Sequence, residues 1–124
     1  MEQSFDLYCK ILIDTDDDRV QLTSFIADHT FGHVERWNVS NDVLLITIRK
    51  NEDFDAQMRE HSDEGYLYSR FYLELEPAEG SEHAQYVKLI AKLLASLWTG
   101  GFKAVAQCEF VDQLPRNGGL DFQS

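Results

Sequence analysis

The order of helix-like and strand-like segments is the feature that most limits the folds open to this chain. An apolar stripe through Leu22 and Ile26 predicts a helix after Asp18, and a stripe through Ile90 and Leu94 predicts a longer helix over 82–99. An amphipathic helix buries its stripe against another layer of structure. Both helices are therefore expected to cover a sheet.

Capping residues stand at the ends of both predicted helices. Thr15 and Asp18 have the spacing of a variant capping box, and Gly32 fits the C-terminal cap of the first helix. Ser81 fits the N-terminal cap of the second helix, which Gly100–Gly101 ends. These residues set the expected helix boundaries.

Alternation of apolar and polar residues predicts about five strands, over residues 5–14, 33–40, 42–50, 66–76 and 102–108. The resulting order β-α-β-β-β-α-β predicts an α+β fold related to the ferredoxin-like plan. In that plan a single, mainly antiparallel sheet carries two helices on one face. The β-α-β unit from Tyr66 to Cys108 predicts a right-handed crossover between parallel strands.

The other segments are expected to be less regular. Residues 51–65 are polar and predict an exposed loop, with a short helical turn around 56–61. The chain is expected to form a single domain over 1–124, with an irregular tail from about 111.

Charge narrows the class of partner. Twenty-two Asp and Glu residues face eleven Lys and Arg residues, for a formal net charge of -11, while 44% of the chain is hydrophobic. A compact domain with this charge repels phosphate backbones and anionic membranes, and it speeds the approach of basic proteins. We therefore expect a basic protein partner, with no nucleic acid and no membrane. The sequence does not indicate the oligomeric state.

The sequence also suggests a compartment. It has no apolar run of the roughly 18 to 20 residues that span a bilayer and no secretory signal at Met1–Ser4, so we expect a cytoplasmic protein. Cys9 and Cys108 stand in apolar alternating stretches, which predicts buried thiols in a reducing compartment. Their spacing does not say whether they are neighbours in the fold.

An acidic run after the first strand prompts two chemical hypotheses. Asp14 and Asp16 have the Asp-x-Asp spacing of haloacid dehalogenase phosphatases, but Asp17 and Asp18 stand where that motif has Gly and Thr. A calcium loop that began at Asp14 would need Gly and Glu at positions occupied by Arg19 and Phe25. Helix capping is the better interpretation of the run.

No other cluster completes a catalytic or metal-binding motif. His29, His33 and Glu35 are close in sequence, but Gly32 interrupts the helix, and no further ligand pair follows. The two cysteines lack the basic neighbours that activate a thiolate. We expect no catalytic residue, no metal and no cofactor.

Two groups of residues are candidates for partner binding. The first follows the strand expected over 66–76, where alternate residues would line the sheet face opposite the helices together with Tyr8: Tyr66, Tyr68, Arg70, Tyr72, Glu74 and Glu76. Aromatic residues and Arg are enriched at interface hot spots. The second group, Glu52, Asp53 and Asp55, lies in the charged loop. The alternative for the first group is an ordinary sheet face partly covered by the tail.

The second half of the chain carries a recurring pattern of core residues: Phe71-Tyr72-Leu73-Glu74-Leu75-Glu76-Pro77, Tyr86-Val87, Leu93-Leu94, Leu97-Trp98, Ala104-Val105-Ala106-Gln107-Cys108-Glu109-Phe110 and Leu114-Pro115. This pattern resembles small acidic bacterial toxin-immunity proteins of contact-dependent or polymorphic toxin systems. It covers roughly residues 66–119, and it implies a stoichiometric inhibitor of a cognate toxin domain, a nuclease in many such systems. The resemblance supplies no binding residues.

Two other classes of function stay open. One is a ferredoxin-like regulatory domain that binds a small ligand or a housekeeping protein. The other is a small phosphatase-like enzyme that uses Asp14 and Asp16. A toxin domain encoded next to this gene would favour immunity, and Mg²⁺-dependent activity lost on Asp14→Asn would favour the enzyme.

Overall fold

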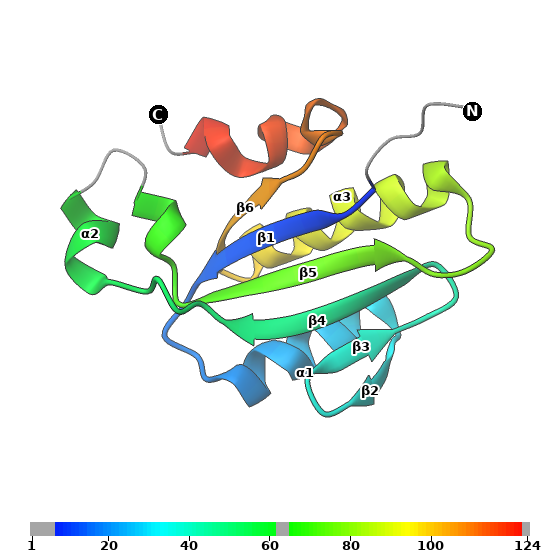
Figure 1. Cartoon of the computed structure of the whole chain (residues 1–124), viewed down its shortest axis with the longest axis horizontal. Helices are drawn as coiled ribbons and strands as arrows, with labels where there is room; N and C mark the ends of the chain where they lie inside the picture. Colours follow the sequence, from blue (N-terminus) through cyan, green and yellow to red (C-terminus); the bar gives the residue numbers. More distant parts are fainter. Residues whose placement is uncertain (1–6, 62–64, 123–124) are drawn as a thin grey trace.

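A computed structural model describes residues 7–61 and 65–122. Within these residues, six strands form one open antiparallel sheet that carries two long helices on one face (Figure 1). The strands are β1 (Cys9–Asp14), β2 (His33–Glu35), β3 (Asn38–Ser40), β4 (Leu44–Lys50), β5 (Phe71–Pro77) and β6 (Lys103–Gln107). The α-helices are α1 (Arg19–Thr30), α2 (Ala56–His61) and α3 (His83–Thr99), and short 3-10 segments are η1 (Gly65–Tyr68), η2 (Val111–Gln113) and η3 (Pro115–Phe122).

The sheet has the strand order β2-β3-β4-β5-β1-β6. Its last four members, with α1 and α3, reproduce the ferredoxin-like plan, and the β2–β3 hairpin extends one edge. β5 and β6 both pair antiparallel with β1, so they run parallel to each other on either side of it. The predicted α+β class, the single sheet and the parallel relation of β5 and β6 are confirmed.

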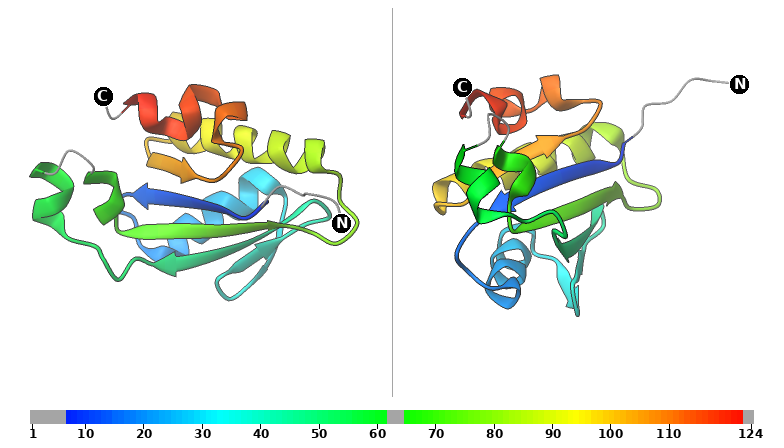
Figure 2. Two further views of the ribbon diagram at one scale, coloured as in Figure 1. Left: turned by 45° about the horizontal axis from the view of Figure 1, so that its top comes forward. Right: turned by 60° about the vertical axis from the view of Figure 1, so that its left-hand side comes forward.

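The core lies between the sheet and the two long helices (Figure 2). Alternate strand residues such as Ile11, Ile46 and Leu73 are fully buried on this face, because β-strand side chains point to opposite sides in turn. They pack with helix residues spaced at three and four positions, which include Ile90 and Leu94. The predicted stripe on α3 is therefore buried, apart from Val87, which is only partly buried.

The caps of the helices differ from the prediction. Asp18 is the N-cap of α1 and forms its capping box with Gln21 rather than with Thr15. Phe31 adopts the left-handed conformation at the C-terminus of α1, where Gly32 was expected to do so. Gly32 instead permits close packing, since a Cβ there would lie 2.4 Å from Val39 Cγ1. In α3 the N-cap is Glu82 rather than Ser81, and its side chain makes no capping hydrogen bond.

Two predicted strands differ from the observed elements: one is split into a hairpin, and the other starts later than expected. Residues 33–40 form the β2–β3 hairpin, in which Arg36 adopts a positive φ of 56° between the strands. The strand expected over 66–76 begins only at Phe71, because the preceding residues form η1. Asn51 holds this turn by donating to the carbonyl oxygens of Leu67 and Ser69. These hydrogen bonds from the side chain of Asn51 hold the carbonyl groups of the turn in place of sheet pairing.

The expected irregular tail folds back against the sheet. We call residues 111–122 the C-terminal strap; it lies beside β6, at the sheet edge opposite the β2–β3 hairpin (Figure 2). Leu114 is buried in the core, and a Cβ on Gly119 would lie 2.4 Å from the Ala104 carbonyl oxygen. The strap therefore covers an edge strand that would otherwise expose unpaired backbone groups.

Candidate functional site

The sheet face opposite α1 and α3 turns toward the viewer in Figure 1. We call its exposed and half-buried residues the open face; they come from β4, β5 and the start of β1: Tyr8, Lys10, Leu45, Thr47, Arg49, Tyr72, Glu74 and Glu76. The register brings them together, since Lys10 and Thr47 both pair with Glu74, and Arg49 pairs with Tyr72. Residues distant in sequence thus form one continuous surface.

Glu74 is the centre of this surface. Tyr8 Oη donates to Glu74 Oε2 at 3.0 Å, and Arg49 Nε donates to Oε1 of the same carboxylate. The hydrogen bond from Arg49 lowers the pKa of Glu74. Burial, followed by the contact with Glu74, raises the pKa of Tyr8 to about 12. Glu74 therefore stays charged and Tyr8 stays protonated across the physiological pH range.

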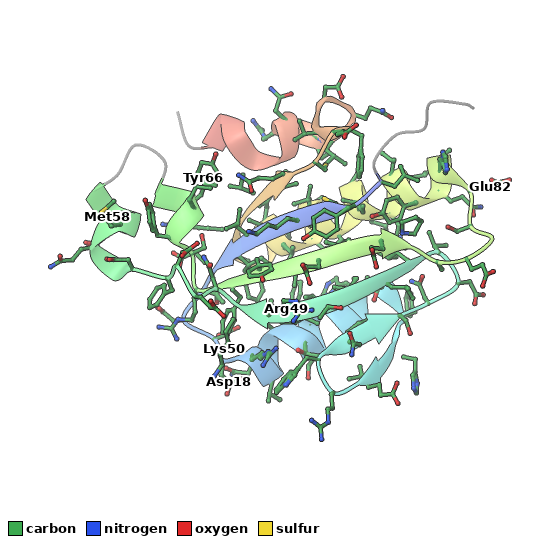
Figure 3. All side chains as sticks on the ribbon, in the orientation of Figure 1. Asp18, Arg49, Lys50, Met58, Tyr66 and Glu82 are labelled. Atoms are coloured by element: carbon green, nitrogen blue, oxygen red, sulfur yellow. The ribbon has the colours of Figure 1, made fainter. Side chains whose placement is uncertain are left out.

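Tyr72 makes a different contact on the same face, with Lys10. Lys10 Nζ lies 4.5 Å from the centroid of its ring, within the range of a cation–π contact. Figure 3 shows Arg49 over the middle of the same sheet. Two aromatic rings and two cations are thus already ordered on the open face, so a partner would meet positioned side chains rather than free ones.

Half of the first predicted binding group lies on this face. Tyr72, Glu74 and Glu76 do so, as the alternation of β5 requires. The placement of Tyr66, Tyr68 and Arg70 beside them was wrong, because the chain leaves the strand geometry before Phe71. Lys10 and Arg49 were missed, although the alternation of their own strands, once paired with β5, places them there.

Tyr66 lies in a hollow of about 370 Å³ at one end of the sheet. Asp14 and Glu60 supply carboxylates to this hollow, and Lys103 supplies a cation. A neighbouring hollow of about 440 Å³ is lined by the acidic run, including Asp16 and Asp17. Among the residues whose side chains are described, no group of three or more His, Cys, Asp or Glu side chains is arranged to hold a metal ion.

The charged loop after β4 has a structural role as well as an exposed surface. Asp55 Oδ1 accepts from the backbone N–H groups of Gln57 and Met58 at 3.0 Å each, so Asp55 caps α2. Glu52 and Asp53 are exposed. The predicted helical turn at 56–61 is confirmed as α2, next to this loop (Figure 1).

Arg70 belongs to a different surface feature, a groove of about 520 Å³ near the start of α1 that we call the aromatic groove. Arg70 Cζ lies 5.3 Å from the ring centroid of Phe54, and Arg19 Cζ lies 4.2 Å from that of Trp37. Arg19 also donates to the Ile48 carbonyl oxygen, whereas Arg70 Nε is buried and has no hydrogen-bond partner among the described residues. Lys50 and Asp18 complete the charged lining (Figure 3).

Comparisons with protein-family models, with curated proteins and with solved structures returned no match. In the part of the chain that the structure describes, no helix combines the length and the apolar character needed to cross a bilayer.

Proposed function

We propose that this protein is a stoichiometric inhibitor of the immunity type, which binds a basic toxin domain in the cytoplasm and neutralises it without turnover. Three features support the proposal. The net charge of -11 favours encounter with a basic protein. The resemblance of residues 66–119 to acidic immunity proteins points to the same class. The open face offers an ordered surface for the partner.

The open face is the observation that carries this proposal. The central charges compensate one another, since Glu74 bonds Arg49 and also interacts with the charge of Lys10. Long-range attraction would therefore come from the excess of acidic residues elsewhere, such as Glu52 and Asp53. Short-range affinity would come from Tyr72 and its neighbours, because hot spots are enriched in Tyr and Arg. Steering and affinity would thus reside in separate regions.

Binding kinetics with the candidate toxin domain would separate these two contributions. We expect Tyr72→Ala to raise the dissociation rate and to weaken binding by about 30-fold or more. The double variant Glu52→Gln, Asp53→Gln should mainly slow association, and more so at low salt. The double variant Glu79→Gln, Glu82→Gln removes the same two charges at exposed positions after β5, and it is the control for net charge.

Neutralisation in cells is the second measurement. Cells that express the toxin domain should survive with the wild-type protein and lose protection with Tyr72→Ala. A candidate toxin that neither binds nor is neutralised, together with substrate turnover by the purified protein, would overturn the proposal. Loss of that turnover on Asp14→Asn would then favour the enzyme.

The aromatic groove supports a second candidate function, binding of a small carboxylate that carries an apolar group. Three cations, Arg19, Lys50 and Arg70, line it with the aromatic rings of Trp37 and Phe54. Among the described residues that line it, Asp18 is the one carboxylate, and its side chain caps α1. Its volume falls in the range of small-molecule sites.

Trp37 provides a direct readout of this second candidate. Titration with 3-phenylpropionate should quench its fluorescence saturably, and Arg70→Gln should weaken that response at least about tenfold. 3-Phenylpropanol, which has no charge, is the matched ligand control. Equal responses to the acid and the alcohol would remove the basis for a carboxylate site.

A further inference from the structure

Two cysteines far apart in sequence meet across the β1–β6 ladder. The last register pair of this ladder joins Lys10 to Gln107, so the next position sets Cys9 opposite Cys108. Both cysteines follow the alternation that directs Ile11 and Ala106 into the core. The register thus places the two side chains next to each other, and both are free thiols.

This arrangement satisfies the geometric requirement for a disulfide. Residues that face each other in an antiparallel pair have Cα atoms about 4.5 to 5.5 Å apart. Disulfides join cysteines whose Cα atoms are about 4.4 to 6.8 Å apart and whose Cβ atoms point toward each other. A bond between Cys9 and Cys108 would therefore require little movement of the two strands.

The two thiols differ in access and acidity. Cys9 is fully buried, whereas Cys108 is half-buried and follows the end of β6. The hydrogen bond from Cys9 lowers the pKa of Cys108, and the same contact together with burial raises the pKa of Cys9. Since the thiolate is the reactive form, Cys108 is the residue that meets an oxidant first.

We propose that Cys9 and Cys108 are a reversible dithiol–disulfide pair, oxidised by a small-molecule disulfide such as glutathione disulfide. The Cys108 thiolate attacks one sulfur of glutathione disulfide, the S–S bond breaks, and a glutathione thiolate leaves and takes up a proton. Cys9 then loses its proton and attacks the Cys108 sulfur as the thiolate; the bond between Cys108 and glutathione breaks, and the second glutathione thiolate leaves and takes up a proton. Two protein thiols are oxidised and one glutathione disulfide is reduced to two thiols.

The bond would add a covalent link at the end of the β1–β6 ladder, where only non-covalent contacts otherwise join the two segments. Cys108 precedes the C-terminal strap by three residues, and Cys9 follows Tyr8 of the open face. Oxidation would therefore tie the base of the strap to the start of β1, the strand next to the edge strand β6. In a reducing cytoplasm the pair stays as thiols, and it would respond when the pool of glutathione becomes oxidised.

Mass spectrometry of the intact, folded wild-type protein tests whether Cys9 and Cys108 form a disulfide. After incubation with excess glutathione disulfide and removal of the reagent, we expect the wild-type monomer to lose about 2 Da, as one internal disulfide requires. Peptide mapping should join the Cys9 and Cys108 peptides, and dithiothreitol should restore the starting mass. The oxidised protein should also melt at a higher temperature than the reduced protein.

Single substitutions of the two cysteines test which thiol reacts first with glutathione disulfide. Cys9→Ala should stop at a glutathione adduct on Cys108, and Cys108→Ala should leave Cys9 unmodified while the protein is folded. Wild-type protein that keeps both thiols free, that accumulates only the Cys108 adduct or that forms only intermolecular dimers would overturn the proposal. These outcomes concern the wild-type chain, so they hold even if a variant fails to fold.

Discussion

The two faces of the sheet show how one alternating pattern produces two different surfaces. On the helix-covered face, strand residues such as Ile11 and Leu73 are fully buried. On the other face, the residues over β4 and β5 are partly exposed, and all of them except Leu45 are polar or aromatic. Leu12 and Val105 on the same face are only 2% and 1% exposed. The η1 segment and the C-terminal strap both lie close to Val105. The alternation of apolar and polar residues therefore determines which side of the sheet a side chain points to. The segments that pack on that side determine how far the side chain is buried.

The largest expected effect compares one leucine from each side of the sheet. Leu94→Ala should lower the free energy of unfolding by about 2 to 5 kcal/mol, because Leu94 is completely buried and its truncation leaves a cavity. Leu45→Ala on the open face, where the side chain is 44% exposed, should change it by less than about 1 kcal/mol. Denaturant unfolding measures both, and equal losses would break the comparison.

The next effect concerns the strap that closes one edge of the sheet. Gly119→Ala should destabilise the protein by more than about 1 kcal/mol, because Gly119 has φ of 108° and its new Cβ would approach the Ala104 carbonyl oxygen. Gly101→Ala is the matched control, since Gly101 also has a positive φ but has open space around it. The difference between the two variants isolates the close approach of the strap to β6.

A smaller loss of stability is expected when the N-cap of α1, on the helix-covered side of the sheet, is removed. Asp18→Ala removes the N-cap and the capping box with Gln21, and it should cost about 1 kcal/mol. Asp16→Ala, two residues earlier and exposed, should stay within about 0.5 kcal/mol of the wild type. Thermal unfolding of the two variants distinguishes a specific cap from a general effect of the acidic run. Greater loss from Asp16→Ala would contradict this assignment.

The smallest expected effect is the pH dependence of the stability that Glu74 contributes on the open face. The pKa of Glu74 is lower in the folded than in the unfolded protein, so its contribution to stability is present above the unfolded pKa. That contribution is lost as the pH falls through the folded pKa. Because Arg49 is about half exposed, we expect less than about 1 kcal/mol. The stability difference between wild type and Glu74→Gln should therefore shrink on acidification from pH 7 to about 3.

Ionisation of Tyr8 at alkaline pH tests the hydrogen bond between Tyr8 and Glu74 from the other partner. Its pKa is raised to about 12, so the stability associated with its protonated form is present below the unfolded value and is lost as the pH rises toward 12. Ultraviolet titration should detect one late-ionising tyrosine that Tyr8→Phe removes and that Glu74→Gln shifts to lower pH. A titration curve that Tyr8→Phe leaves unchanged at its alkaline end would contradict the raised pKa of Tyr8.

Much of this fold follows from patterns that are local in the sequence. The alternation around Ile11 and Leu73 and the helical spacing of Ile90 and Leu94 predict the elements, and their order predicts the α+β plan. The division of residues 33–40 into a hairpin was not predicted, because a reversal at Arg36 carries no glycine or proline signal. The start of β5 was placed too early, because Asn51, distant in sequence, holds η1 in a turn.

The sequence alone determined which side chains share a strand face and how acidic the chain is, since both properties are read from neighbouring residues and counts. Only the tertiary structure decided which strands are neighbours. It placed Lys10 and Arg49 beside Tyr72 and Glu74, it moved Arg70 to the aromatic groove, and it brought Cys9 to Cys108. Strand pairing depends on contacts between residues far apart in the chain, and a local pattern of apolar and polar residues does not specify those contacts.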